Sequence, residues 1–118
     1  MAGPVVAVVG ASSDRRKFGN RAVRAFLRQG YDVKPVNPSE ATIEGLPAYR
    51  TIADVPGPID IVSMYVPADI GLGLLEAIAA RRPRELWINP GAESSALEAR
   101  ARELGLSPIY ACSIVALG

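Results

Sequence analysis

The chain has no histidine and only one cysteine, Cys112, among its 118 residues. Without histidine it can carry no serine–histidine–aspartate triad, no histidine metal ligand and no phosphohistidine. A single cysteine excludes an internal disulfide and any Cys-x-x-Cys metal or redox motif. We therefore expect neither a metal site nor independent catalysis, and we predict no catalytic residue.

The chain also lacks an excess of charge of one sign and a long apolar run. Its 13 Lys and Arg nearly balance 12 Asp and Glu, so no overall field favours nucleic acid or an anionic membrane. No apolar run reaches the length of about 18 residues that a membrane helix needs, and the N-terminus has no basic region followed by an apolar core and a cleavage site. We expect a cytoplasmic protein with neither a nucleic-acid nor a membrane partner.

The N-terminal residues have the pattern of a strand, a glycine turn and a helix. Residues 4–9 are wholly apolar, Gly10-Ala11-Ser12 follows, and apolar residues recur at helical spacing between 19 and 29. Free N–H groups and the dipole at the start of such a helix favour an anion. The turn therefore predicts a phosphate site, and we expect a branched side chain at Gly10 to enter the space of the anion. The basic residues after the turn are Arg15, Arg16, Lys17, Arg21, Arg24 and Arg28, of which Lys17 and Arg21 flank the start of the helix and are preferred as phosphate ligands.

Strands and helices alternate along the rest of the chain. Short apolar runs predict strands at 33–36, 59–66, 86–88 and 108–110, and helical spacing predicts a helix at 68–80 and another from 95. Ser95-x-x-Glu98 has the spacing of a capping box. The core stripe predicted for the helix at 68–80 is Ile70, Leu74, Leu75 and Ile78. Residues 39–58 have weak periodicity and are predicted to form a loop with a short helix or turn. Together these elements predict that residues 1–118 form one domain, an α/β fold of three layers around a five-stranded, mainly parallel sheet.

The ends of the predicted strands indicate a nucleotide-like ligand, because ligands of such sheets bind beyond the carboxyl ends of the strands. A dinucleotide-binding G-x-G-x-x-G is absent, since position 12 is serine, and Asn37 follows the second strand where NAD-binding folds usually place an acid. Gly10 is not followed by the Gly-Lys-Ser or Gly-Lys-Thr of a P-loop. Glu40 lies close enough to replace the missing acid, so NAD(H) stays open as an alternative.

Five segments, taken in order, resemble the CoA-binding domain family. They are Gly10-Ala11-Ser12 with Gly19, then residues 33–38, 46–49, 65–68 and 87–91. The family includes small stand-alone CoA-binding proteins and the N-terminal domain of the succinyl-CoA synthetase α subunit, and the resemblance spans almost the whole chain. It implies a Rossmann-like fold that binds the ADP part of coenzyme A or an acyl-CoA without covalent chemistry.

The resemblance also implies which residues form the site. The implied pyrophosphate loop is Gly10, Ala11, Ser12, Lys17, Phe18 and Gly19. The implied adenine and ribose walls are Val36, Asn37, Pro38, Tyr65, Val66 and Pro67, and the implied far edge is Asn89, Pro90 and Gly91. Arg21 is also predicted to bind the cofactor, because it is a basic residue that flanks the start of the first helix.

The sequence departs from the family in two places. Relatives often have a lysine after the Asn-Pro segment, within reach of the CoA 3′-phosphate, but here Ser39-Glu40 follows Pro38. Recognition of that phosphate then depends on Arg15, Arg16 or Arg21. The second domain of the synthetase subunit, with its phosphorylated histidine, has no counterpart. Two alternatives therefore remain: an NAD(H)-binding redox enzyme or sensor, and an interaction domain that acts only with a partner chain.

Three further expectations concern the packing of single segments. Tyr65 is expected to pack its ring at a strand end and keep its hydroxyl in water. Asp60 is expected at the amino edge of the sheet in a structural role, because an unpaired buried charge is costly. The apolar tail, residues 113–118, is expected to cover the sheet edge or to meet a second subunit, and a homodimer is the commonest oligomer.

Overall fold

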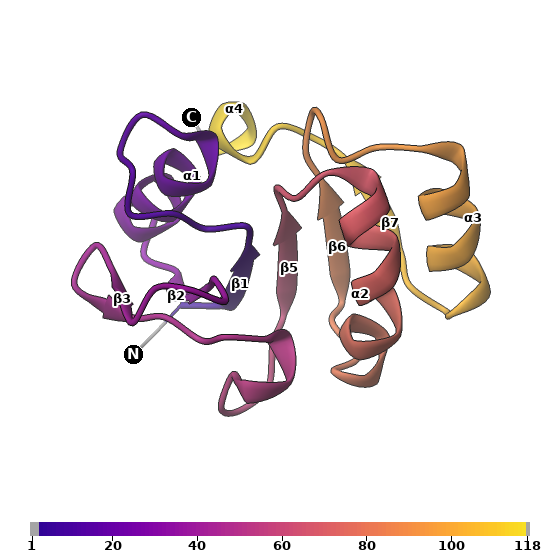
Figure 1. Cartoon of the computed structure of the whole chain (residues 1–118), viewed down its shortest axis with the longest axis horizontal. Coiled ribbons are helices and arrows are strands. Elements are labelled where there is room, and N and C mark those ends of the chain that lie inside the picture. Colours follow the sequence, from indigo (N-terminus) through magenta and orange to yellow (C-terminus); the bar gives the residue numbers. More distant parts are fainter. Residues whose placement is uncertain (1–2, 118) are drawn as a thin grey trace.

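The computed structural model describes residues 3–117 and contains a five-stranded parallel sheet with helices on both faces (Figure 1). The strands are β1 (Val5–Val9), β2 (Asp32–Val36), β5 (Ile61–Met64), β6 (Glu85–Ile88) and β7 (Pro108–Tyr110), and their order in the sheet is β2-β1-β5-β6-β7. The helices α1 (Phe18–Arg28) and α4 (Ser113–Ala116) share one face, and α2 (Ala68–Ala80) and α3 (Ser95–Glu103) cover the other. The predicted three-layer, Rossmann-like α/β fold is confirmed.

The strand β1, which lies between β2 and β5, is apolar because both of its faces are buried. Ala7 and Val9 belong to the core under α2 and α3, whereas Val6 and Val8 belong to the core under α1. None of these four side chains is more than 3% exposed. This alternation explains why the run shows no polar residue, as is usual for parallel strands covered on both sides.

The strand order reverses between β1 and β5, which lie side by side although they are far apart in the sequence. The chain leaves β1 for β2 on one side, then returns to place β5, β6 and β7 on the other. Val9 pairs with Val36 of β2 and with Met64 of β5, so three strands end at the same level. Such a reversal leaves a crevice beyond the carboxyl ends of the strands, where ligands of this fold bind.

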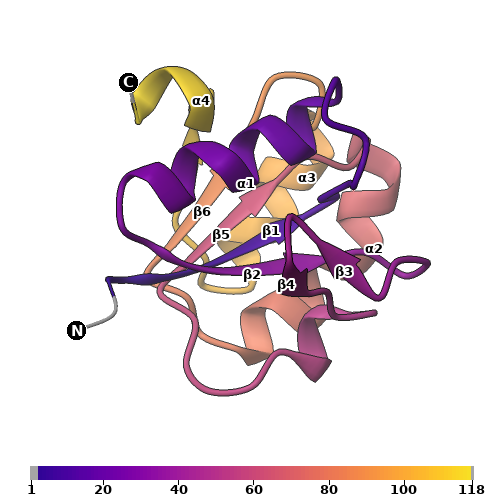
Figure 2. The same ribbon diagram turned by 90° about the vertical axis from the view of Figure 1, so that its left-hand side faces the viewer.

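Residues 39–58 form more regular structure than the sequence predicts. A hairpin of β3 (Thr42–Ile43) and β4 (Leu46–Pro47) lies beside β2 (Figure 2), and a 3₁₀ turn, η1 (Ile52–Asp54), follows. Glu44 and Gly45 connect the two strands with φ of 50° and 77°. Positive φ at both central residues is typical of a two-residue type I′ turn.

The boundaries of one predicted strand and the cap of one predicted helix are corrected. The strand predicted at 59–66 is limited to Ile61–Met64, while the predicted helix at 68–80 matches α2. The predicted capping box at Ser95 and Glu98 is wrong, because Ser94 is the N-cap residue of α3 and its hydroxyl accepts a hydrogen bond from the Leu97 N–H at 3.0 Å. The cap therefore lies one residue earlier.

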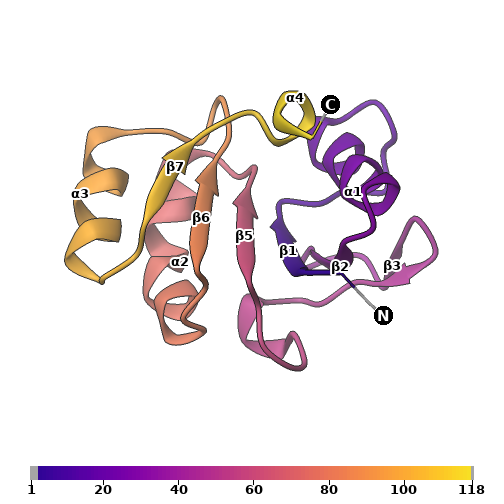
Figure 3. The same cartoon turned by 180° about the vertical axis from the view of Figure 1, so that it is seen from behind.

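The C-terminal segment crosses the strand ends instead of covering the edge of the sheet. Figure 3 shows it running from β7 past the ends of β6 and β5 to α4, which lies beside α1. The Gln29 side chain donates a hydrogen bond to the Leu117 carbonyl at 3.0 Å. Asp60 lies at the opposite, amino edge, where it accepts a hydrogen bond from the Val5 N–H at 2.8 Å and pairs with Arg84, as expected. Within residues 3–117 no helix combines the length and the apolar character that crossing a membrane requires.

Candidate functional site

A cavity of about 430 Å³ lies beyond the carboxyl ends of β1, β2 and β5, at the point where the strand order reverses. Every residue that lines it is among the predicted site residues. The lining residues are Gly10, Ala11, Ser12, Lys17, Phe18, Gly19, Asn37, Pro38, Tyr65, Val66, Pro67 and Pro90. Of the other predicted residues, Val36 lines an adjoining cavity, and Arg21, Asn89 and Gly91 line neither.

Two glycines form the floor of this cavity. Gly10 has a φ of +93°, and a Cβ there would lie 3.1 Å from the main-chain carbon of Tyr65 and 3.1 Å from a Val66 methyl group. A Cβ on Gly19 would collide with the Gly10 carbonyl. The start of α1 therefore rests directly on the turn. A Cβ at position 10 would crowd the main chain of Tyr65 in a backbone conformation that favours glycine, so we expect a branched side chain there to destabilise the fold as well as to obstruct the cavity.

The first turn of α1 is left open to an external anion. Its N-cap residue, Lys17, makes no side-chain capping bond, and the first turn contains no acidic residue. The N–H groups of Phe18 and Gly19 are among the first-turn donors, which have no acceptor inside a helix. These donors, the helix dipole and the Lys17 ammonium place positive charge on one wall of the cavity.

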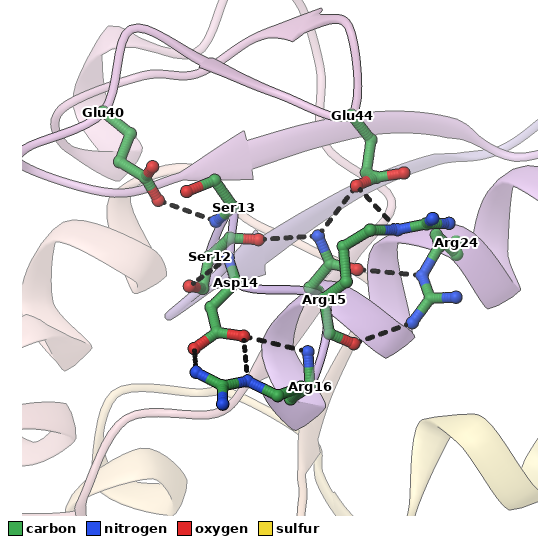
Figure 4. Close-up of polar contacts among 9 residues, drawn as sticks. Ser12, Ser13, Asp14, Arg15, Arg16, Arg24, Glu40 and Glu44 are labelled. Carbon is green, nitrogen blue, oxygen red and sulfur yellow. Dashed lines mark hydrogen bonds and ion pairs between the residues drawn. The ribbon is translucent and has the colours of Figure 1, made fainter.

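The loop between β1 and α1 is held by its own ion pairs (Figure 4). Asp14 accepts two hydrogen bonds from the Arg16 guanidinium, both at 3.1 Å, and these bonds lower the pKa of the Asp14 carboxyl to about 2. The Arg15 guanidinium lies 3.5 Å from the Glu44 carboxylate of the hairpin turn. Arg15 and Arg16, two of the cations suggested for the 3′-phosphate, are thus engaged within the protein.

Asn20 joins the loop, the hairpin and α1, and the sequence analysis did not identify it. Its fully buried amide donates to the Ser12 carbonyl at 2.9 Å and to the Glu44 carboxylate at 3.0 Å. Its side-chain oxygen accepts from the Arg24 Nε at 2.8 Å. Arg24 in turn donates to the Arg15 carbonyl at 2.9 Å. A polar residue in the buried stripe of an amphipathic helix was the signal that could have revealed it.

Lys17 and Arg21 differ from Arg15 and Arg16, which pair with carboxylates. Among residues 3–117, neither forms an ion pair with a carboxylate. Lys17 lines the cavity, whereas the Arg21 guanidinium lies over the Phe18 ring, 5.2 Å from its centroid. Stacking of this kind is a cation–π contact. Lys17 is therefore the cation best placed to bind an anion in the cavity.

A second cavity of about 390 Å³ adjoins the first and is almost entirely apolar. It shares Gly10, Pro38 and Val66 with the first cavity. Its other lining residues are Val9, Val36, Arg50, Thr51, Ile52, Ile70, Leu74 and Ile78. A slot of this size and chemistry suits a flat aromatic group. Ile70 is 53% exposed, so its predicted place in the core is corrected to a place on the cavity wall.

Tyr65 lies between the first cavity and the C-terminal segment. The predicted solvent contact of its hydroxyl is wrong: the oxygen is buried and has no hydrogen-bond partner among residues 3–117, although Ser113 and Ile114 lie near it. Burial raises the pKa of Tyr65 to about 12. A small pocket of about 100 Å³ continues past this ring, between Phe18 and Pro90, to the half-buried Cys112.

Asn89 is fully buried and holds the C-terminal segment. Its amide donates to the Ser63 hydroxyl at 3.0 Å and to the Met64 carbonyl at 2.9 Å. Its side-chain oxygen accepts from the Ser113 N–H at 2.8 Å and from the Ser113 hydroxyl at 2.9 Å. Gly91 is exposed, and its N–H lies 3.1 Å from both carboxylate oxygens of Glu93. The structure therefore places these two predicted site residues outside the cavity.

Comparisons with known proteins agree with this geometry. A family model described as a CoA binding domain matches residues 4–118. The alpha subunit of ADP-forming acetate–CoA ligase II from Pyrococcus furiosus is 36% identical over 63 residues, which are 52% of this chain but only 14% of the subunit. A solved structure of a conserved hypothetical protein from Pyrococcus furiosus has a TM-score of 0.90 and 32% identity, and the match covers 97% of this chain and 99% of that one. Acetyl-coenzyme A synthetase 1 (dinucleotide forming) of Ca. Korarchaeum cryptofilum has a TM-score of 0.78 and 28% identity, over 92% of this chain and 26% of that protein.

Proposed function

Because this chain belongs to the CoA-binding domain family, we propose that it binds coenzyme A or an acyl-CoA through the ADP moiety and catalyses no reaction itself. One observation carries this proposal: a cavity walled by an uncapped helix N-terminus adjoins an apolar slot across Gly10, Pro38 and Val66. An ADP group has the same division, with two phosphates at one end, a flat base at the other and a ribose that joins them.

The pyrophosphate is assigned to the first cavity. The open first turn of α1 offers N–H donors, and Lys17 adds a charge without an internal partner among the described residues. Hydrogen bonds from charged donors to phosphate are about twice as strong as neutral ones. Gly10 and Gly19 keep side chains away from the floor, so the phosphates can approach the backbone.

The adenine is assigned to the second cavity, between the ends of β1 and β2 and the first turns of α2. Val36 and Pro38 line one side of this slot, and Val66, Ile70 and Leu74 line another. Burying a flat base against these side chains supplies the hydrophobic part of the affinity. The ribose then lies at the residues that both cavities share, and the pantetheine arm leaves past Phe18 and Pro90.

The chemistry of the cavity walls supports a role in binding rather than catalysis. The titratable residues that line the two cavities are Lys17, Arg50 and Tyr65. The phenol of Tyr65, with its pKa raised to about 12, is a poor proton acceptor near neutral pH. No nucleophile beside a base lines the described cavities. The ligase and the synthetase that the chain resembles are much longer, and the matches cover only 14 and 26% of their length.

The NAD(H) alternative depended on Glu40 as a ribose-binding acid. In the structure the Glu40 carboxylate accepts a hydrogen bond from the Ser13 N–H at 2.7 Å (Figure 4). This bond lowers the pKa of Glu40 and fixes the side chain on the phosphate loop. The carboxylate is therefore engaged before any ribose arrives, and no contact favours NAD(H) over CoA.

Isothermal titration calorimetry with CoA, ADP and NAD, together with thermal unfolding in the same ligands, tests the proposal. We expect CoA at about one hundred times its Kd to add roughly 2.7 kcal/mol to the free energy of unfolding. Lys17→Gln should weaken CoA binding by about tenfold. Arg28→Gln is the matched control, because Arg28 lies at the other end of α1. Stabilisation by NAD alone, or by no ligand, would contradict the proposal.

A further inference from the structure

A third cavity opens beside the proposed nucleotide site. It has a volume of about 470 Å³ and is lined by Pro38, Ser39, Glu40, Ala41, Ala48 and Arg50. Pro38 also lines both of the other cavities, and Arg50 also lines the apolar slot. The three cavities therefore meet around Pro38, and Arg50 stands at the boundary between the apolar slot and the third cavity.

The Arg50 side chain has no internal partner within residues 3–117. It is exposed, and it forms neither an ion pair nor a hydrogen bond with the described residues. The other arginines near the site differ in this respect: Arg15 and Arg16 pair with carboxylates, and Arg21 stacks on Phe18. A guanidinium without a partner at a cavity wall is available to an external anion.

The chemistry of CoA indicates which anion reaches this position. The ribose joins the base to the 5′-pyrophosphate, so it lies where the slot and the first cavity share Gly10, Pro38 and Val66. Its 3′-phosphate leaves the ring next to the carbon that carries the pyrophosphate arm. From a ribose beside Pro38, the third cavity is the adjoining space that neither the base nor the pyrophosphate occupies.

The charges around the third cavity mean that an anion there needs Arg50. Glu40 is the acidic residue of the lining, and its hydrogen bond with Ser13 keeps the carboxylate ionised by lowering its pKa. The N–H groups of Ser39 and Glu40 are engaged with the Asn37 side chain, at 2.7 and 3.2 Å. Repulsion from Glu40 must therefore be offset by a cation, and Arg50 is the basic residue of the lining.

We propose that Arg50 binds the 3′-phosphate of CoA and makes the site select CoA over dephospho-CoA. This inference rests on the proposed function and adds a specificity-determining residue to it. The planar fork of a guanidinium can form two parallel hydrogen bonds with a phosphate. Arg50 thus replaces Arg15, Arg16 and Arg21, the residues expected from the sequence to recognise the 3′-phosphate.

The test is the ratio of two dissociation constants, measured by calorimetry with CoA and with dephospho-CoA on the same protein. We expect the wild-type protein to bind CoA about tenfold more tightly. Arg50→Gln should reduce that preference to less than about twofold while leaving the Kd of dephospho-CoA unchanged. Arg28→Gln removes the same charge far from the site and should retain the preference. Unchanged thermal unfolding of each free variant shows that its fold is intact.

The outcomes separate this inference from the proposed function. A wild-type protein that binds both ligands equally, or an Arg50→Gln variant that keeps the wild-type preference, overturns the role of Arg50 and leaves ADP binding standing. Failure of the wild-type protein to bind either ligand overturns the proposed function, and the inference fails with it.

Discussion

Asn89 and Asn37 are a natural pair for separating stability from binding, since each precedes a proline just beyond a strand of the sheet. Asn37 lines the first cavity, whereas Asn89 is fully buried below the C-terminal segment. We predict that Asn89→Ala lowers the free energy of unfolding without changing the affinity for CoA. Asn37→Ala should change both, because its amide also holds the Ala11 carbonyl at 2.8 Å.

The magnitude for Asn89→Ala follows from the bonds that are lost. Four hydrogen bonds between 2.8 and 3.0 Å join this amide to Ser63, Met64 and Ser113. At a net contribution of about 0.5 to 1.5 kcal/mol each, and with the buried Ser113 N–H left without an acceptor, we expect a loss of about 3 kcal/mol. With an unfolding entropy near 2.1 cal/mol/K per residue, that loss lowers the Tm of the 118-residue chain by roughly 12 °C.

Urea unfolding of the free proteins, followed by calorimetric titration of the folded variants with CoA, measures both effects. Asn89→Ala should unfold at a lower urea midpoint with an unchanged dependence of the free energy on urea, and its CoA Kd should stay within about twofold of wild type. A loss of stability below about 1 kcal/mol would falsify the assignment of a structural role to this amide. A large rise in Kd at unchanged stability would instead return Asn89 to the binding site.

Three further variants test other parts of the site. Gly10→Val should lower the free energy of unfolding, measured in urea, by about 2 kcal/mol or more, because position 10 has a positive φ and its Cβ would crowd Tyr65. Its control is Gly73→Ala, at an open position in α2, which should raise the free energy of unfolding by about 0.5 to 1 kcal/mol. Equal effects of the two would refute the steric argument. Tyr65→Phe should leave the free protein as stable as wild type or up to about 1 kcal/mol more stable, because the hydroxyl is buried without a partner among the described residues. The wild-type protein should lose stability as pH rises from 10 to 12, and the variant should not show this loss. A clear destabilisation by Tyr65→Phe would reveal a hydroxyl partner. The contribution of the Asp14–Arg16 pair to the free energy of unfolding is fully present above the ordinary Asp pKa of 3.8 and should disappear as pH falls toward 2. The urea midpoints of wild type and Asp14→Asn should therefore differ at neutral pH and converge near pH 2. Equal midpoints at neutral pH would show that the pair contributes nothing.

The sheet, its helices and the position of the first cavity could be predicted from the sequence because local patterns determine them. Apolar runs such as residues 5–9 form buried parallel strands, and helical spacing gave the limits of α2 at Ala68 and Ala80. The rule that ligands bind beyond the carboxyl strand ends then brought together Gly10, Asn37 and Tyr65, which are distant in the sequence.

The parts that could not be predicted depend on contacts between distant segments. Strands of two residues are too short to show alternation, and Glu44-Gly45 is not one of the Asn-Gly or Asp-Gly pairs that indicate a hairpin, so the hairpin that carries Glu44 could not be predicted. Without Glu44 in place, the engagement of Arg15 could not be foreseen. The same weakly patterned region carries Arg50, whose position beside Pro38 depends on how the chain returns to β2.

The use of charge around α1 explains how a loop with so many cations can still present an open anion site. Half of the six cations hold the loop: Arg16 pairs with Asp14, Arg15 pairs with Glu44, and Arg24 donates a hydrogen bond to Asn20. These contacts fix the loop through side chains and the Ser12 carbonyl, so within residues 3–117 they leave the first-turn N–H groups of α1 unoccupied. A serine or aspartate cap would satisfy one of those donors and stabilise the helix by about 1 kcal/mol, but it would also occupy the position proposed for the phosphates. Under the proposed function, the missing cap at Lys17 is therefore best explained as a cost in stability that keeps the proposed nucleotide site open.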